Sequence, residues 1–254
     1  MHLLGTGRTP ATVRLRVDYL RRFARAMERG PWEVTTADIV EWSALNMWAR
    51  DTRRSALASV RGFYRWAEAS DHPTIVVTDR IPTIRASAPS PRPADDPSVR
   101  RAIASEDWRV SLAVRLAAEL GLRRGEVAKV RGCDVVSDLL GYSLIVHGKG
   151  DKTRTIPITL DLAQSITEHG SGWTFEGNDH GHLSPAWIGR IVGRALPTGV
   201  TMHSLRHRFA TRAYERTSDL VAVQKILGHT SPQTTLRYLA IADMSLRRVV
   251  EAVA

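Results

Sequence analysis

The sequence predicts a mainly α-helical protein with a small β-sheet, arranged as two domains. Three observations support this fold class. Apolar residues recur every three or four positions over much of the chain, β-branched residues flank a tight turn within 142–158, and residues 81–97 contain five prolines. We therefore predict a helical domain at 1–80, a semi-extended linker at 81–97, and a second domain of helices and sheet at 98–254.

The first domain is expected to hold three helices. Thr9 followed by Pro10 is a typical N-cap and first turn, and Gly30 with Pro31 should end that helix. Thr36 and Asp51 are expected to cap the second and third helices. Apolar faces are predicted at Val13, Val17, Leu20, Ala24 and Met27 on the first helix, Ile39 and Trp42 on the second, and Leu57, Val60, Tyr64 and Ala67 on the third.

The second domain is expected to begin with a helix from Trp108 to Leu120, ended by Gly121. Residues 142–158 predict a β-hairpin around the turn GKGD. Further helices should start near Ser184, Thr201, Ser218 and Ser231, and residues 246–253 carry another helical apolar stripe.

The charge balance indicates a polyanionic partner. The formal net charge is +10 and the sequence pI is about 10.5, which favours nucleic acid first and an acidic membrane second. Basic residues line the polar faces of the first and third predicted helices, where the alternatives are a solvated basic surface and a DNA-binding one. We predict DNA contacts from Arg14, Arg21, Arg25, Arg53, Arg54, Arg61 and Arg65.

Other classes of protein are excluded or disfavoured. A single cysteine, Cys133, rules out an intramolecular disulfide and a cysteine-rich metal site, and we expect it to be a small core residue. The N-terminus lacks the apolar run of a signal peptide, and no stretch approaches the length of a membrane span. The expected setting is the bacterial cytoplasm or nucleoid.

The stretch HSLRHRFAT places His203, Arg206, His207 and Arg208 within six residues. Such crowding is repulsive unless an anion lies among the side chains. His203 and His207 have a metal-ligand spacing, but Ser204 stands where a metalloprotease has glutamate, and a guanidinium would repel a cation. Arginine matches phosphate oxygens, so an oxyanion such as phosphate is favoured.

Three further motifs accompany this stretch. LGLRRGEVAKV places Arg123 after a glycine and Glu126 three residues later. GKGDKTR exposes Lys149 between two glycines, and LGHTSPQTTLRY contains His229 and, nine residues later, Tyr238. Each residue alone has a structural reading, as a helix-end cation, a cap, a turn lysine, a loop histidine or a half-buried aromatic. Their shared order and spacing favour a common site.

This ordered set resembles the tyrosine recombinases, the phage integrase family, over residues 10–250 and most densely over 118–240. The resemblance implies a helical core-binding domain and an α+β catalytic domain that close as a C-shaped clamp on DNA. It also implies that Tyr238 attacks the scissile phosphate, forming a 3′-phosphotyrosyl bond. In the same way, Arg123 and Arg206 would bind the non-bridging phosphate oxygens, and His229 would donate a hydrogen bond to the phosphate. Lys149 would act as the general acid and His203 as the general base. Glu126 would hold the catalytic side chains in position.

The chemistry of these side chains agrees with the implied roles. Two arginines can stabilise charge on phosphate oxygens without a metal, and a phenol with an ordinary pKa of about 10 needs nearby cations and an imidazole to lose its proton. No cofactor is implied. We expect Arg124 and Arg208 to be DNA-backbone or surface residues, Lys152 to contact DNA, and His207 to pack. Tyr19, Tyr64, Tyr142 and Tyr214 are not expected to be nucleophiles.

The expected partners are double-stranded DNA with core-type attachment sites and three further copies of the chain, in a tetramer on synapsed DNA. A directionality factor is a further candidate partner, and a membrane is not. Because the core-binding helices begin within ten residues of Met1, we expect no arm-binding domain. The stripe at 246–253 is predicted to pass between neighbouring subunits, with packing on its own domain as the alternative, and the tail VVEAVA is a weaker candidate degradation signal.

The predicted function is a site-specific recombinase, with phage integration favoured over chromosome-dimer resolution by a Xer-like enzyme. Two alternatives stay open at the level of sequence. A type IB topoisomerase shares the tyrosine chemistry but lacks sequence-specific tetrameric cleavage. A catalytically silent DNA-binding protein would use the same scaffold without forming a covalent intermediate.

Overall fold

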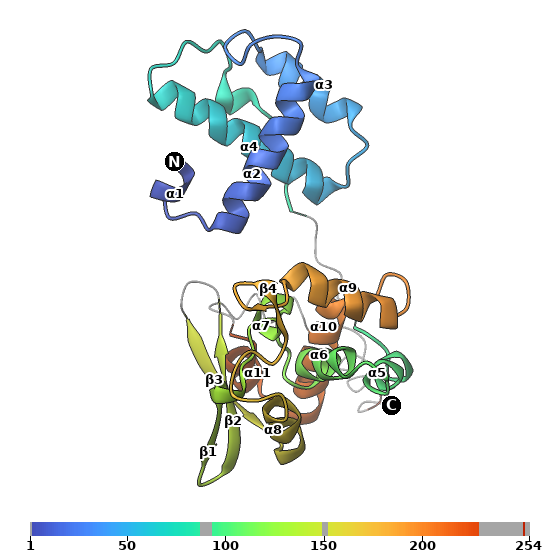
Figure 1. The fold of residues 1–254 in the computed structure, drawn as a ribbon. Coiled ribbons are helices and arrows are strands. Elements are labelled where there is room, and N and C mark those ends of the chain that lie inside the picture. Colours follow the sequence, from blue (N-terminus) through green and yellow to red (C-terminus); the bar gives the residue numbers. More distant parts are fainter. Residues whose placement is uncertain (1, 87–92, 149–151, 229–250, 252–254) are drawn as a thin grey trace. The chain divides into compact units, whose positions relative to one another are not determined.

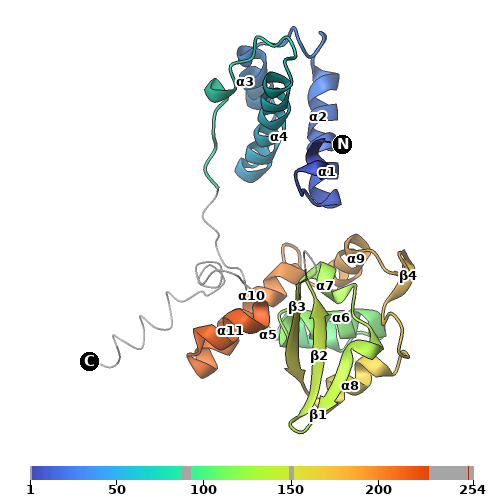
Figure 2. The ribbon, with the colours of Figure 1, turned by 90° about the vertical axis from the view of Figure 1, so that its left-hand side faces the viewer.

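The structure is a computed structural model, and it describes residues 2–86, 93–148, 152–228 and 251. The chain divides into two compact units, Met1–Ala88 and Pro89–Ala254. Each unit has a hydrophobic core of its own. Figures 1 and 2 show the helices and strands of each unit.

The first unit is helical, and α2 packs against α4 along its length. Edge-to-face contacts join Phe23 of α2 to Trp42 of α3, with ring centroids 4.8 Å apart, and Trp42 to Trp48, 4.9 Å apart. These aromatic pairs fill the centre of the small core. Its elements are α1 (His2–Gly5), α2 (Pro10–Ala26), α3 (Thr36–Leu45), α4 (Arg50–Ala69) and the 3₁₀ turn η1 (Thr78–Arg80).

The predicted start of α2 is confirmed, since the Thr9 side chain accepts a hydrogen bond from the Thr12 N–H. Two other predicted caps were wrong. Thr35, not Thr36, caps α3 in a capping box: the Thr35 hydroxyl accepts from the Asp38 backbone N–H, and the Asp38 carboxylate accepts from the Thr35 backbone N–H. Ala49 precedes α4, and Asp51 lies in its first turn, where a carboxylate still favours the positive helix end.

The buried faces of these helices agree only in part with the predicted stripes. The four residues predicted for α4, Leu57, Val60, Tyr64 and Ala67, are all buried. On α2 the buried residues are instead Tyr19 and Phe23, and Ala24 is exposed. Large aromatic side chains reach the core from positions beside the aliphatic stripe, and they displace it from the centre of the interface.

The second unit is built around α6, which buries seven of its twelve residues against α5, α9 and α10. A three-stranded antiparallel sheet, ordered β1-β2-β3, lies beside these helices, with α8 against β1 and β2 (Figure 2). Its elements are α5 (Asp96–Ile103), α6 (Trp108–Glu119), α7 (Arg124–Val127), η2 (Gly132–Asp134), β1 (Val135–Asp138), β2 (Gly141–His147), β3 (Thr153–Ile158), α8 (Leu160–Thr167), β4 (Glu176–Asp179), α9 (Pro185–Ala195), α10 (Met202–Thr217) and α11 (Leu220–Leu227).

The predicted hairpin is confirmed, because β2 and β3 pair from Tyr142 opposite Ile158 to His147 opposite Thr153. Ser184 and Thr201 cap α9 and α10 as predicted. The helix predicted near Ser218 is confirmed as α11, but Ser218 itself is not its cap. It ends α10 in the left-handed conformation, with φ of 53°, and Asp219 caps α11 instead. The predicted helices near Ser231 and at 246–253 lie outside the described residues.

The structure shortens the linker that was predicted at 81–97. Ile81 is buried in the first core and Ile84 packs against it, while Ala94 belongs to the second core and Asp95 caps α5. Segments at both ends of the predicted linker 81–97 are therefore packed. Of the helices that the structure describes, none combines the length and the apolar character needed to cross a membrane.

Cys133 was wrongly predicted to be a core residue, because the structure leaves it exposed. It is the middle residue of the 3₁₀ turn η2. The flanking Gly132 and Asp134 are both buried, so the tight turn directs the residue between them outward.

Candidate active site

Glu126 is a buried carboxylate at the centre of the second unit's arginine cluster. The short helix α7 places it one turn after Arg123. The Arg123 backbone N–H donates to Glu126 Oε2 at 2.8 Å, and Arg123 Nη1 donates to Oε1 at 2.9 Å. The sequence motif GLRxxE thus acts as a local clasp, in which the glutamate both caps the helix and holds the preceding arginine.

Arg154 binds the same carboxylate from β3. Its Nη1 and Nη2 donate to Glu126 Oε1 and Oε2 at 3.0 and 2.9 Å, and its Nε donates to the Ile226 carbonyl at 2.6 Å. Sequence analysis did not single out Arg154. The available signal was strand alternation, because Arg154 shares a strand face with the buried Ile156, where an arginine needs a carboxylate partner.

Arg206, at the start of the second turn of α10, is almost completely buried, with 1% of its surface exposed. Its Nη1 donates to the Gly121 carbonyl and lies 3.8 Å from Glu126 Oε2, and its Nη2 donates to the Leu227 carbonyl at 2.7 Å. The Leu227 carbonyl also accepts from Arg123 Nη1 at 3.4 Å. The structure therefore brings the GLR, HxLRH and LG segments of the sequence to one place.

Two glycines make this convergence sterically feasible. Gly121 has φ of +66°, and a Cβ there would lie 2.5 Å from the Phe209 ring. Gly228 ends α11 with φ of +63°, and a Cβ there would lie 3.1 Å from the Arg154 side chain. Both positions need the left-handed backbone that glycine adopts freely, and both lie beside carbonyls that bind the arginines.

The cluster carries a net positive charge. Burial would raise the pKa of Glu126, but hydrogen bonds and charge from Arg154, with further contributions from Arg123, hold that pKa below its ordinary value. Glu126 is therefore ionised at neutral pH. Three guanidinium groups around one carboxylate leave a charge of +2, which suits a phosphodiester whose charge increases in the transition state.

His203 lies one turn before Arg206 and stays exposed. Desolvation by the surrounding protein, together with the positive charges of Arg206 and Arg123, lowers its pKa below the ordinary 6.5. The ring is therefore neutral at pH 7 and can accept a proton. His207, expected to pack, is buried, and its ring lies edge-on to His203 with centroids 4.5 Å apart.

Three of the predicted catalytic residues, Lys149, His229 and Tyr238, lie outside the described residues. The structure does describe the residues that flank two of them. The Gly148 N–H donates to the Lys152 carbonyl at 2.7 Å across the base of the hairpin turn, and Gly228 immediately precedes His229.

Arg208 has a different position from the one expected for a DNA-backbone or surface residue. Its Nε and Nη2 donate to Asp96 Oδ1 at 3.0 and 2.9 Å, and Arg212 binds the other oxygen of the same carboxylate. Arg208 therefore ties α10 to the start of α5. Arg124 and Lys152 are exposed.

The predicted DNA-contacting arginines of the first unit fall into two groups. Arg53 Nη2 donates to the Asn46 carbonyl at 3.0 Å, and Arg61 Nη2 donates to the Ile81 and Pro82 carbonyls, both at 2.7 Å, so these two are partly buried in local contacts. The exposed group consists of Arg14, Arg21, Arg25, Arg54 and Arg65.

Among the residues that the structure describes, no three His, Cys, Asp or Glu side chains are grouped to hold a metal ion. The described part of the site holds fixed guanidinium groups, a neutral imidazole and a single paired carboxylate, and this set of charges favours an anion over a cation.

Comparison with known proteins identifies the class. The sequence model described as the Phage integrase family matches residues 98–244. Tyrosine recombinase XerC of Methylobacterium sp. (strain 4-46) is 32% identical over 222 residues, which cover 78% of this chain and 69% of the relative. The chain belongs to the phage integrase family of tyrosine recombinases.

Solved structures agree with this assignment. The integrase from mycobacterium phage Brujita is 25% identical, with a TM-score of 0.51 over 97% of this chain and 86% of that one. XerA recombinase is also 25% identical, with a TM-score of 0.54 over 99% and 94% of the two chains. A lambda integrase dimer bound to a core site, 18% identical over 95% and 93%, shares the fold with a TM-score of 0.75.

Proposed function

We propose that this site-specific recombinase integrates phage DNA, cutting and rejoining attachment sites as a homotetramer through a 3′-phosphotyrosyl intermediate. The observation that carries the proposal is the cluster of Arg123, Arg154 and Arg206 around Glu126, beside the neutral ring of His203. This arrangement combines fixed donors for phosphate oxygens with a base for a phenol.

The proposed reaction uses each motif once. His203 takes the proton of Tyr238, and the phenolate oxygen bonds to the scissile phosphorus while the bond to the 5′ oxygen breaks. Lys149 protonates that leaving oxygen, which becomes a 5′-hydroxyl. Rejoining reverses these steps with a different 5′-hydroxyl, and the phosphotyrosyl bond conserves the energy of the phosphodiester.

Arg123 and Arg206 are proposed to bind the non-bridging oxygens, with His229 as a further donor. Glu126 and Arg154 act through them, because they fix the position of the first arginine and the charge around the second. Preorganisation of this kind lowers the barrier because no donor has to reorient as negative charge develops.

The proposed partner is double-stranded DNA, and the similar lambda integrase dimer was solved bound to a core site. The net charge of +10 supports it. The exposed arginines of α2 and α4 and Lys152 are proposed as backbone contacts, with the first unit as the core-type DNA-binding domain and the second as the catalytic domain. A directionality factor and residence in the bacterial cytoplasm belong to the same proposal.

A second candidate function is resolution of chromosome dimers. It is favoured by the relatives named tyrosine recombinase XerC, which include proteins from Methylobacterium, Bradyrhizobium and Brucella. The chemistry would be the same, and only the DNA sites would differ.

Covalent capture tests the proposal. The protein is incubated with fragmented bacterial and phage DNA without metal or nucleotide and then denatured, and the adducted residue is identified by mass spectrometry. We expect phosphate on Tyr238 at one short sequence with a free 5′-hydroxyl. Captured sites in a phage and at one bacterial target support integration, whereas a single chromosomal site supports dimer resolution.

Two outcomes would contradict the proposal. Adducts on Tyr238 scattered over many sequences would indicate a topoisomerase. Absence of any adduct despite DNA binding, with Tyr238→Phe behaving like the original chain, would indicate a silent DNA-binding protein.

A further inference from the structure

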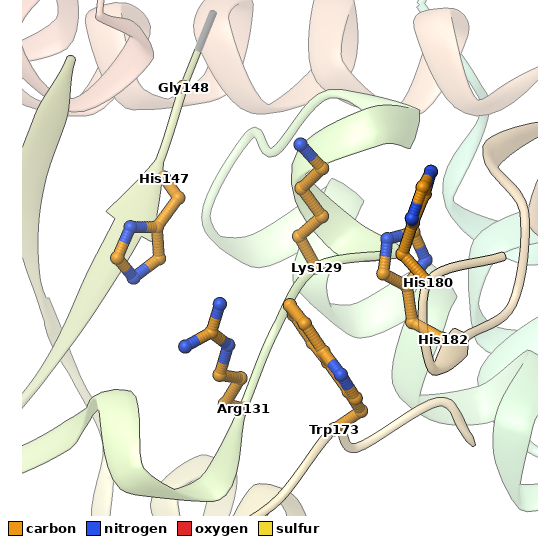
Figure 3. Close-up of a pocket in the computed structure, with 7 residues that line it drawn as sticks. All are labelled: Lys129, Arg131, His147, Gly148, Trp173, His180 and His182. Atoms are coloured by element: carbon orange, nitrogen blue, oxygen red, sulfur yellow. The ribbon is translucent and has the colours of Figure 1, made fainter. Parts of the chain in front are cut away.

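A pocket of about 340 Å³ lies beside the arginine cluster, lined mainly by basic and imidazole side chains. Figure 3 shows the Lys129 side chain between His147 on one side and His180, His182 and Trp173 on the other. None of the cationic residues that line it was assigned a role above. Its composition therefore requires an explanation beyond the catalytic set.

Arg131 and Trp173, which form one side of the pocket, are held in place by contacts with each other. Arg131 lies over the Trp173 ring, with its guanidinium carbon 4.0 Å from the ring centroid, and the two backbones form an isolated antiparallel bridge. The Thr174 N–H donates to the Val130 carbonyl at 3.0 Å beside this bridge. The cation–π contact and the backbone bridge together fix the direction of the Arg131 guanidinium.

His180 and His182, which line another side of the pocket, are also held in place. His182 is 4% exposed, and its Nδ1 contacts the Leu183 carbonyl at 2.7 Å, so the proton on Nδ1 is fixed by that acceptor. His180 has φ of 56°, which is uncommon for a residue with a side chain. A Cβ at Gly181 would lie 2.8 Å from the Trp173 indole nitrogen, so only glycine fits between them. Such local strain is typical of ligand-binding positions.

The lining chemistry fits an anion. Among the described residues no set of His, Cys, Asp or Glu side chains is arranged for a metal, and Lys129 and Arg131 would repel a cation. Asp134 lies next to the pocket, and its Oδ1 is 2.9 Å from His147 Nε2, so its charge is directed at that ring. A phosphate group matches the ammonium of Lys129 and the guanidinium of Arg131, with the His180 ring beside them.

The pocket also adjoins the arginine cluster through the backbone. The Lys129 N–H donates to the Glu126 carbonyl at 3.1 Å, which places Lys129 one turn beyond Glu126. On the other side, a Cβ at Gly148, which lines the pocket, would lie 4.0 Å from Glu126 Oε1. A strand whose scissile phosphate lies at the cluster would therefore pass this pocket within a short length of backbone.

We propose that this pocket binds a second, non-scissile phosphate of the cleaved DNA strand through Lys129 and Arg131, and so sets the register of the scissile phosphate. The inference rests on the proposed function, because it assumes that DNA occupies the arginine cluster. Lys129 and Arg131 are positioning residues and do not touch the reacting atoms.

Duplex binding as a function of salt tests the inference. Each phosphate that a protein neutralises contributes about 0.9 to the slope of log affinity against log salt. All proteins carry Tyr238→Phe, so binding is measured whether or not the chain cleaves DNA. Lys129→Ala is compared with Arg109→Ala, a matched control in which an arginine lies 5.0 Å over the Trp108 ring, away from the pocket. His180→Asn, which tolerates the same backbone conformation, gives a second pocket variant.

We expect Lys129→Ala to reduce the salt slope by about 0.9 and to weaken duplex binding several-fold, with Arg109→Ala unchanged. The His180 ring signal in NMR should move when duplex is added. Equal slopes for Lys129→Ala and the control would overturn the inference and leave the recombinase proposal intact. A His180 signal that moves with inorganic phosphate and not with duplex would also overturn it, and would assign the pocket to a free anion.

Discussion

The arginines of the two units have contrasting surroundings. In the first unit, ion pairs such as Arg21 with Asp18 and Arg65 with Asp79 are exposed on helix surfaces, at 3.9 and 3.3 Å. In the second unit, Arg206 is buried and Arg154 is partly buried, and both contact Glu126 and backbone carbonyls. An exposed pair contributes about 0–1 kcal/mol and its members remain available to a polyanion, whereas a buried cluster depends on every partner. The same side chain thus serves diffuse attraction in one unit and fixed geometry in the other.

The largest expected effect comes from removing the carboxylate at the centre of the buried cluster. Glu126→Ala leaves three guanidinium groups facing one another, and we expect the free energy of unfolding of the second unit to fall by about 3–5 kcal/mol. Asp79→Ala, which removes the partner of exposed Arg65, should change the first unit by less than about 0.5 kcal/mol. Hydrogen exchange read by mass spectrometry reports the two units separately. A similar loss in the free energy of unfolding for Glu126→Ala and Asp79→Ala would contradict the difference between the buried and the exposed arginines.

The next effect concerns His203 and pH. At subsaturating DNA, the rate of adduct formation should rise with pH through the pKa of His203, which lies below 6.5, and then level off, because only the neutral ring accepts a proton. His203→Gln should lower the rate by about 100-fold and remove the rise of the rate with pH (the acid limb of the profile). Rapid-quench rates between pH 5 and 8 measure it. Persistence of the same limb in His203→Gln would assign it to another group.

Stability should follow the same titration. Since the folded pKa of His203 is lower than the unfolded value of 6.5, the unfolded chain binds more protons between these two values. The contribution of this group is fully present above pH 6.5 and is lost as the pH falls through the folded pKa.

Arg61 of the first unit resembles the arginines of the second unit, because it donates hydrogen bonds to backbone carbonyls. Arg61 donates to the Ile81 and Pro82 carbonyls, so Arg61→Met should destabilise the first unit by about 1–2 kcal/mol. Arg65→Met, one turn along the same helix, should cost less than about 0.5 kcal/mol. Thermal unfolding of both variants provides the measurement, and equal melting temperatures would show that the carbonyl contacts of Arg61 add nothing.

The smallest effect on stability is expected at an exposed arginine. Arg25→Ala should leave the free energy of unfolding within about 0.5 kcal/mol and reduce the salt slope of DNA binding by about 0.9. Fluorescence anisotropy at several salt concentrations measures the slope. An unchanged slope would remove Arg25 from the DNA contacts.

The sequence predicted those elements whose signals are local. Thr9, Ser184 and Thr201 cap helices because a hydroxyl bonds an amide two or three residues away, and the β2–β3 hairpin follows from strand alternation around glycines. The missed elements are short. β1 and α7 have four residues each, too few for a periodicity, and α5 and α8, with eight residues each, span only about two turns.

The candidate site shows the same limit. The Arg123–Glu126 clasp spans three residues and could be expected from the motif, whereas Arg154 reaches Glu126 across 28 residues and Arg206 reaches the Gly121 carbonyl across 85. Contacts over such separations depend on how β3 packs against α11 and how α10 packs against α6, which no short window of sequence specifies. The pocket around Lys129 has the same origin, since the 173–182 segment reaches it only in the folded unit.

The most direct test of the account compares Arg206→Lys with Arg25→Ala in the rate of covalent adduct formation at saturating DNA, where differences in binding no longer contribute. Hydrogen exchange first confirms that both proteins are folded. We predict that Arg206→Lys loses about 100- to 1,000-fold, because an ammonium cannot reproduce the fixed donors of the guanidinium, and that Arg25→Ala reacts at the original rate. A folded Arg206→Lys that retains the original rate would contradict the claim that the buried cluster is the site of the chemistry.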